Sequence, residues 1–131
     1  MASIFTKIIN KEIPAFIVAE DEQHIAFLDI MPVAMGHVLV VPKKETDYVF
    51  HLSDSELSSL FVFAKKVALG IEKAVPCKKV GIAVIGLEVP HTHVHLVPMQ
   101  NVGDINFAKE KLKPATDDLL IIAEQIKAYL S

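Results

Sequence analysis

Short blocks of apolar residues, separated by proline, glycine or charged turns, run through most of the chain. Blocks rich in β-branched and aromatic residues are typical of strands, in which successive side chains point to opposite faces of a sheet. The run at 80–85 is apolar throughout, which favours a strand covered on both faces. The pattern as a whole predicts strands over 16–20, 25–29, 37–41, 80–85 and 91–97.

Two longer segments carry apolar residues at every third and fourth position, as one face of an α-helix does. The first covers 54–75, and Ser53 with Glu56 fits a capping box at its start. The second covers 117–130, with Thr116 as a candidate cap. Its apolar face is suited to packing on its own sheet or on a second subunit.

The order of these elements favours an α+β fold with a mostly antiparallel sheet of about five strands, a long helix and a C-terminal helix. The segment 4–9 is too short for periodicity to separate a helix from an irregular segment. The chain has 131 residues, of which 52% are hydrophobic and 22% charged. This is the size and composition of one globular domain, so we expect a single domain over 1–131.

Charge and composition exclude several classes of partner. The formal net charge is -3 and no block of like charges occurs, so a footprint for long nucleic acid is not expected. No run of about 18 apolar residues predicts a membrane span, and residues 1–7 do not resemble a signal peptide. The single cysteine, Cys77, forms no internal disulfide and fits a reducing compartment, so we expect a cytoplasmic protein.

Histidines occupy three alternate positions, His91, His93 and His95. In a strand they would share one face, with neighbouring Cα atoms about 6.6 Å apart, while residues 92, 94 and 96 face a core. Such a row is suited to nucleophilic and acid–base work on phosphate, because imidazole titrates near neutrality. Two other interpretations stay open: a structural role, and a catalytic zinc site that would need a ligand from elsewhere.

The segment 91–97 resembles the triad of the histidine-triad (HIT) family, and three upstream blocks strengthen the resemblance. Residues 4–15 resemble the opening of its Hint branch, and 26–32 and 36–43 resemble the next two blocks. The resemblance covers about 3–98, so it implies a HIT-like fold with a C-terminal extension over 99–131.

Members of this family cleave the bond between the α-phosphate of a nucleotide and a leaving group, without a cofactor. The resemblance implies that His93 is the nucleophile and forms a nucleotidyl-histidine intermediate. His91 and His95 would orient it and assist the phosphate oxygens and the leaving group, and His37 would support them. It also implies a homodimer that binds AMP, GMP or conjugates of purine nucleoside monophosphates.

The same resemblance implies the nucleotide contacts. Asp29 would accept the ribose hydroxyls, as a carboxylate can, although it could instead cap the turn before Met31. A loop from Gly86 to Val89 would hold the phosphate through its backbone amides. Apolar residues that would surround the base, or else belong to a plain core, are Ile4, Phe5, Ile8, Phe27 and Ile30.

Departures from the family pattern lie directly before the triad. Gly86, Leu87, Glu88 and Val89 stand where the family usually carries Gly-Gln-Ser/Thr-Val. The hydroxyl and the amide are therefore replaced, and a carboxylate near a phosphate is repulsive unless it is protonated or turned away. The early cysteines of zinc-holding members are also missing, so we expect no metal.

Three functions follow from these observations. The first is hydrolysis of purine nucleoside phosphoramidates or related nucleotidyl conjugates, with dinucleoside polyphosphates as another substrate class. The second is a nucleotide-binding module with weak or no catalysis, which Leu87 and Glu88 favour. The third is a metal-dependent hydrolase that uses His91, His93 and His95.

Overall fold

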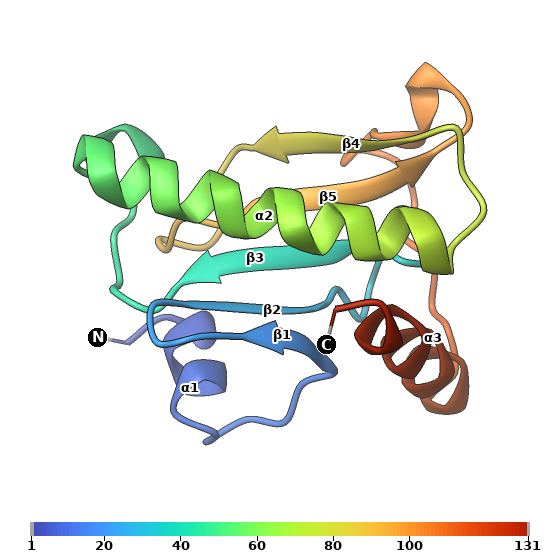
Figure 1. The fold of residues 1–131 in the computed structure, drawn as a ribbon, viewed down its shortest axis with the longest axis horizontal. Helices are drawn as coiled ribbons and strands as arrows, with labels where there is room; N and C mark the ends of the chain where they lie inside the picture. The colour runs from blue at the N-terminus through green and yellow to red at the C-terminus, as the bar shows by residue number, and fades with distance from the viewer. Residues whose placement is uncertain (1, 131) are drawn as a thin grey trace.

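A five-stranded antiparallel sheet forms the centre of the fold (Figure 1). The structure, a computed structural model, describes residues 2–130. The predicted α+β architecture is confirmed, since every neighbouring pair of strands is antiparallel. In sheet order the strands are β1 (Ile17–Glu20), β2 (His24–Leu28), β3 (Val38–Pro42), β5 (Val94–Met99) and β4 (Lys79–Val84).

Three helices accompany the sheet, and their caps are local in sequence. Segment 4–9 is a helix, α1 (Ile4–Ile9), in which the Ser3 hydroxyl accepts from the Thr6 amide. The predicted capping box of Ser53 and Glu56 opens α2 (Asp54–Ala74). The predicted cap of α3 (Thr116–Ala128) was wrong, because Ala115 holds the cap position and makes no side-chain bond. None of the helices within 2–130 is long and apolar enough to cross a membrane.

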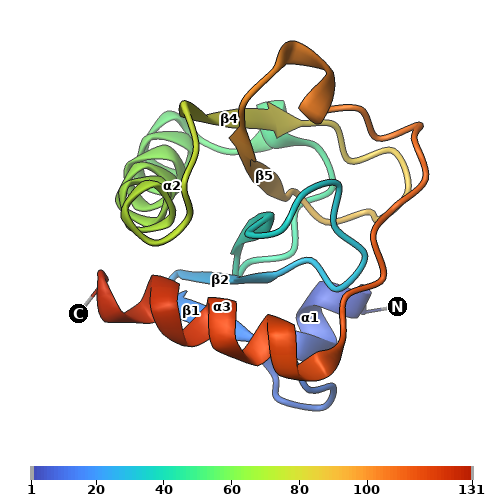
Figure 2. The same cartoon turned by 90° about the vertical axis from the view of Figure 1, so that its right-hand side faces the viewer.

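The helices lie on different sides of the sheet (Figure 2). α2 packs on one face and α1 on the other, and α3 runs beside β1. Leu119, Ala123 and Ile126 of α3 are buried in the same core cluster as α2, so the C-terminal helix packs on its own chain. A smaller cluster forms under α1 and contains Phe5, Ile8, Ile25, Phe27, Leu39 and Val41.

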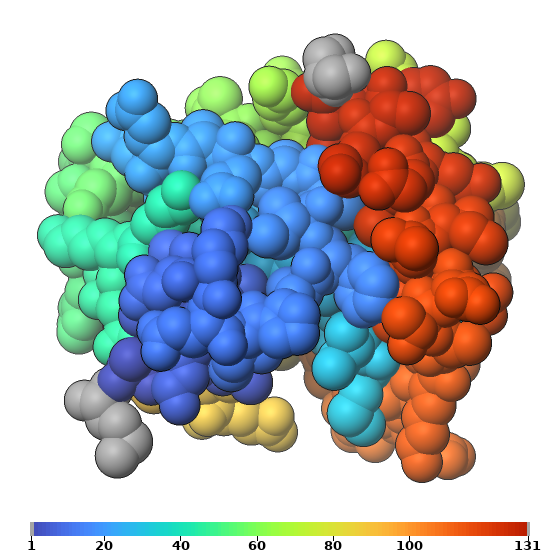
Figure 3. Space-filling view, turned by 90° about the horizontal axis from the view of Figure 1, so that it is seen from below, coloured from blue at the N-terminus to red at the C-terminus, as the bar shows by residue number. Residues whose placement is uncertain are grey.

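Figure 3 shows the side of the molecule on which α1 and α3 are both exposed. α1 (blue) and α3 (red) cover separate parts of it, and the loop after β2 (cyan) lies between them. The backbone amide of Leu112 donates to the carbonyl of Pro32 in this loop at 2.9 Å. The segment that precedes α3 is thereby held against the loop between β2 and β3.

One strand is less covered than its sequence predicts. We expected 80–85 to be buried on both faces, but β4 is an edge strand that pairs with β5. Ile82 is 52% exposed, and Ile85, just past the strand, is 50% exposed. An unbroken apolar run therefore marks a sheet edge here, not its centre, and the outer edge of β4 has no strand partner within residues 2–130.

The histidine-rich segment enters the sheet later than predicted. β5 begins at Val94, so His91 and His93 precede the strand. From there on the predicted alternation is confirmed, because Val94 and Leu96 belong to the core cluster that contains α2. His95 lies opposite Leu39 of β3, a member of the cluster under α1. On the sheet face under α1, β3 therefore carries apolar residues and β5 carries His95.

Candidate active site

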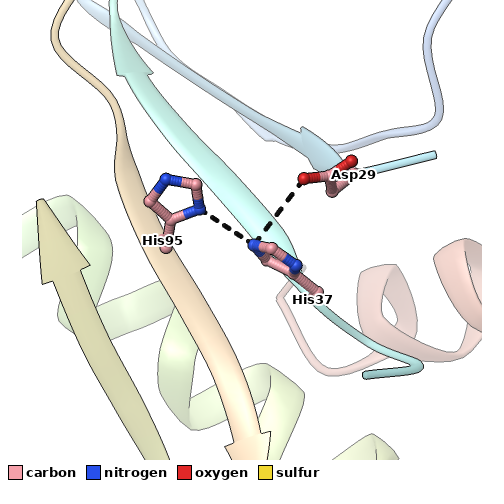
Figure 4. A group of neighbouring side chains, drawn as sticks. All are labelled: Asp29, His37 and His95. Atoms are coloured by element: carbon pink, nitrogen blue, oxygen red, sulfur yellow. Dashed lines mark hydrogen bonds and ion pairs between the residues drawn. The ribbon is translucent and has the colours of Figure 1, made fainter. Parts of the chain in front are cut away.

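The pairing of β3 with β5 brings His37 and His95 together from positions 58 residues apart. Leu39 lies opposite His95, and His37 stands two residues before Leu39, on the same face. Nε2 of His37 lies 2.9 Å from Nδ1 of His95 (Figure 4). Both side chains are buried.

Hydrogen bonds determine the protonation pattern of this pair. The Val33 amide, which can only donate, bonds to Nδ1 of His37 at 3.2 Å. A neutral His37 therefore carries its proton on Nε2 and donates it to Nδ1 of His95. His95 in turn carries its proton on Nε2, which is the nitrogen left free for a ligand.

Burial keeps both rings neutral. It lowers the pKa of His37 to about 3, with the charges of His95, Lys111 and His93 adding to the effect. It lowers the pKa of His95 to about 4, and the charge of His93 contributes. At pH 7 the pair is a chain of directed hydrogen bonds without net charge.

The backbone carbonyl of His91 orients the His93 ring. Its Nδ1 lies 2.8 Å from the carbonyl oxygen of His91, and because that oxygen can only accept, Nδ1 carries the proton. The lone pair of a neutral His93 is then on Nε2. Phe5 and His95 flank the ring, each with its centroid 4.9 Å away. His93 thus presents an unprotonated nitrogen in a fixed orientation.

His91 does not join the other two at the cavity. It is fully buried and donates from Nε2 to the carbonyl of Pro42 at 2.7 Å. Its Nδ1 lies 2.8 Å from the hydroxyl of Ser3, the cap of α1. The Glu45 carboxylate accepts from the amide of Ser3 and the hydroxyl of Thr6. His91 therefore ties α1 to the end of β3, and its backbone carbonyl orients His93.

Asp29 follows β2, and one of its two carboxylate oxygens has the capping role considered for it. Oδ1 accepts from the amide of Met31 at 2.9 Å, so this oxygen caps the turn. Oδ2 lies 3.8 Å from Nε2 of His37 and is without a closer donor among residues 2–130 (Figure 4). Burial raises the pKa of Asp29, which the Met31 amide and the charges of His93 and Lys111 oppose.

A cavity of about 560 Å³ adjoins His93, His95 and Asp29. One side of it is apolar and is built by α1, the segment after it, and β2 and β3. All five residues predicted to surround a base line this cavity, although Ile4 and Ile30 are also exposed to solvent. The lining residues on this apolar side are Ile4, Phe5, Ile8, Ile13, Pro14, Ala15, Phe27, Leu28, Ile30 and Leu39.

The loop after β4 also lines the cavity. Gly86, Glu88 and Val89 all line the cavity, and so does Leu87, which is 89% exposed. Gly86 has φ +70, a conformation that side-chain-bearing residues rarely adopt. The glycine therefore allows the turn by which this loop reaches the cavity.

Several lining residues escaped the sequence analysis, among them Phe107 and Lys111 in the segment between β5 and α3. The Phe107 ring lies 4.5 Å from the His95 ring and 6.0 Å from the His37 ring, centroid to centroid. No periodicity or motif marks these two positions, because neither lies in a helix or strand.

A metal site of three triad histidines is not assembled in the described structure, because both ring nitrogens of His91 contact protein atoms. Asp29, His37 and His95 do place one possible ligand atom each within 4.8 Å of one another. Nε2 of His37 and Nδ1 of His95 lie 2.9 Å apart, with the proton of the hydrogen bond between them. A cation there would have to displace that proton.

A second hollow, of about 730 Å³, lies between β1, α2 and α3. It contains His24, whose Nδ1 lies 3.0 Å from Asp21. This hollow is wider and more open than the cavity at His93. We expect the chemistry at the latter, because it adjoins an oriented histidine pair, a carboxylate and a large apolar wall.

The comparison with known proteins agrees with this geometry. The HIT domain family model matches residues 10–102. The chain belongs to the HIT family. It is 44% identical over 106 residues to a HIT-like protein of Methanocaldococcus jannaschii. The matched region covers 72% of this chain and 77% of that relative.

Two further HIT relatives resemble the chain over most of its length. It is 36% identical over 103 residues to the adenosine 5′-monophosphoramidase hnt1 of Schizosaccharomyces pombe, with 77% of each chain covered. The crystal structure of a Hit-like protein from Bartonella henselae superposes with a TM-score of 0.85 at 31% identity. That match covers 98% of this chain and 96% of the other.

Proposed function

We propose that this HIT protein hydrolyses purine nucleoside phosphoramidates or related nucleotidyl conjugates at the α-phosphate, through a nucleotidyl intermediate on His93. One observation carries the proposal. The bond from Nδ1 of His93 to the His91 carbonyl leaves Nε2 as an oriented nucleophile, beside the donor Nε2–H of His95.

The reaction takes two displacements at phosphorus. In the first, Nε2 of His93 forms a bond to the α-phosphorus, and the leaving amine departs with the P–N bonding electrons and takes up a proton. In the second, water attacks phosphorus, the P–N bond to His93 breaks, and its electrons return to Nε2 while the water loses a proton. AMP and free amine are the products.

The neighbouring groups each have a task in this scheme. The neutral Nε2–H of His95 donates to a phosphate oxygen as charge builds on it. Oδ2 of Asp29, the oxygen not used by Met31, accepts from the ribose hydroxyls. The apolar wall encloses the base, and the Gly86–Val89 loop offers its amides to the phosphate.

The relatives support the reaction class. The fission yeast relative is named an adenosine 5′-monophosphoramidase. The position of His93 in the cavity supports the same reaction in this chain, with AMP or GMP as the nucleotide released. Dinucleoside polyphosphates are a further substrate class, since the same attack on the α-phosphorus would release a nucleotide from them.

A second function is a nucleotide-binding module with weak or no catalysis. Glu88 and Leu87 favour it, because both line the cavity wall that faces the phosphate. Leu87 brings no hydrogen-bonding group to this wall, and an ionised Glu88 repels an anion.

We also propose that the protein is a homodimer. The support is the edge strand β4, with its unpaired outer edge and exposed Ile82. An exposed strand edge pairs readily with a second copy. Light scattering tests this directly, and a particle of 14.4 kDa at working concentration would contradict it.

The decisive experiment is a mass-spectrometric assay with adenosine 5′-phosphoramidate. Wild type is compared with His93→Ala and with His51→Ala, an exposed histidine outside the cavity lining. We expect AMP release by wild type and His51→Ala, and a loss of roughly ten-thousandfold in His93→Ala. Trapped wild type should carry an adenylyl group on the peptide that contains His93.

The other outcomes decide between the functions. Full turnover by His93→Ala would overturn the mechanism. AMP binding without turnover by wild type, with phosphoramidates, dinucleoside polyphosphates and nucleotidyl sulfates all tried, would establish the binding module instead.

A further inference from the structure

The crossing segment, residues 101–114, connects β5 to α3 (Figure 2). Two of its residues, Phe107 and Lys111, line the cavity. Phe107 packs on the ring of His95 at 4.5 Å. The amide of Leu112 bonds to Pro32, shortly after Asp29. The segment therefore passes from the phosphate-binding histidine of the proposed function to the proposed ribose carboxylate, and Lys111 lines the cavity between these contacts.

The charges around the cavity do not match an anionic ligand without Lys111. Asp29 and Glu88 bring two carboxylates to the lining, while His37 and His95 are neutral. The whole chain contains no arginine, the usual bidentate partner of a phosphate. Among the described residues that line the cavity, Lys111 is the single lysine.

Local hydrogen bonds hold Lys111 in place. Its ammonium donates to the backbone carbonyls of Phe107 and Lys109. An ammonium has three N–H donors, so one remains for a ligand. No carboxylate lies within 4.0 Å of it in residues 2–130. Its positive charge is thus half-buried, positioned and not neutralised by an ion pair.

We infer that Lys111 binds the α-phosphate oxygens of the nucleotide and is the main source of fixed positive charge for them. The inference rests on the proposed function only in taking a nucleotide as the ligand. The crossing segment is then part of the binding site. Lys111 is the residue that discriminates between a nucleotide and its nucleoside.

Glu88 is exposed and also lines the cavity. A phosphate near both groups would be repelled by the carboxylate and attracted by the ammonium, which two backbone carbonyls hold in place. The charge of Lys111 also reaches the neighbouring groups, since it is among the influences that lower the pKa of Asp29 against the larger effect of burial.

The test is calorimetric titration of the full chain with adenosine and with AMP. Lys111→Gln removes the charge while its amide can still donate to the two carbonyls. Lys111→Arg keeps the charge, and Lys113→Gln removes a lysine from the same segment that lies outside this cavity lining. Thermal melting of each variant checks that it is folded.

We expect Lys111→Gln to weaken AMP binding by roughly ten- to a hundredfold, the range for a hydrogen bond to a charged group. Adenosine binding should stay within about twofold, Lys111→Arg should retain most of the AMP affinity, and Lys113→Gln should match wild type. The loss for AMP should shrink at high salt.

Two results would overturn the inference: unchanged AMP affinity in a folded Lys111→Gln protein, or an equal loss for AMP and adenosine, which would mean that Lys111 only shapes the cavity. These outcomes are independent of turnover. If wild type releases no AMP from any conjugate but Lys111→Gln selectively loses AMP binding, the proposed hydrolysis fails and the inference stands.

Discussion

Nε2 of His37 donates to Nδ1 of His95 across 2.9 Å, and the Val33 amide bonded to the far side of His37 sets the direction of that donation. Three hydrogen-bonding groups from two parts of the chain thereby fix which nitrogen of His95 faces the cavity with a proton. The role proposed for His95 depends on this direction, because a phosphate oxygen needs a donor and not a second lone pair.

Replacing His37 should therefore damage catalysis through His95. In His37→Ala, His95 loses its partner and its tautomer preference, and we expect kcat for adenosine 5′-phosphoramidate to fall by roughly ten- to a hundredfold. His37→Gln offers an amide N–H to the same nitrogen and should recover part of the loss. Equal activity in wild type and a folded His37→Ala protein would show that the donation has no role.

Stability should depend on pH through the buried histidines. His37 and His95 have folded pKa values of about 3 and about 4, below the usual 6.5. The unfolded chain therefore binds more protons below pH 6.5, and stability falls as the pH drops from there toward 4. At pH 5 the loss is roughly 2 kcal/mol for each ring, as an upper bound.

Urea unfolding at pH 7.5, 6.5, 5.5 and 5.0 measures this dependence. The free energy of unfolding should fall by less than about 1 kcal/mol between the two higher values and more steeply below them. His37→Gln should show a smaller fall, because one of the two buried rings is missing. A profile that is flat down to pH 5 in wild type would contradict neutral burial of the pair.

Ser3 connects the stability of α1 to the site. Its hydroxyl caps the helix and bonds to the fully buried His91. Ser3→Ala should cost about 1–2 kcal/mol of stability. It should also weaken AMP binding, because α1 carries Phe5 and Ile8 on the apolar wall.

Ser53→Ala is the matched control, since it removes the cap of α2, which contributes no residue to the cavity lining. We expect a loss of about 1 kcal/mol in its unfolding free energy and no change in AMP affinity. If both variants bound AMP like wild type, α1 would not be coupled to the ligand through Ser3.

Glu88 should limit the rate with anionic substrates. Glu88→Gln removes its charge from the cavity wall, and we expect kcat/KM for adenosine 5′-phosphoramidate to rise by roughly three- to tenfold. In Glu88→Ser, which adds the hydroxyl common in the family, kcat/KM should rise at least as far. Glu110→Gln, an exposed carboxylate outside the lining, serves as the control. A fall in both Glu88 variants would mean that the carboxylate assists the reaction.

Much of the fold could be predicted because its signals are local. The capping box of Ser53 and Glu56 and the apolar periodicity behind it predict α2 almost to the residue. The alternation of apolar residues predicts the strands to within three residues at each start. β4 was misjudged because an apolar run indicates burial without saying what covers it, and the structure leaves Ile82 half exposed.

By itself, the sequence determined the family, the antiparallel α+β fold and part of the cavity lining, because these depend on local patterns and on a motif with fixed spacing. Only the tertiary structure separated His91, bound to Ser3 and Pro42, from His93 at the cavity. It alone brought Lys111 to the cavity, from a segment without periodicity. Contacts between residues far apart in the chain decide which histidine nitrogen holds a proton and which charges lie near one another. A one-dimensional pattern does not contain these contacts.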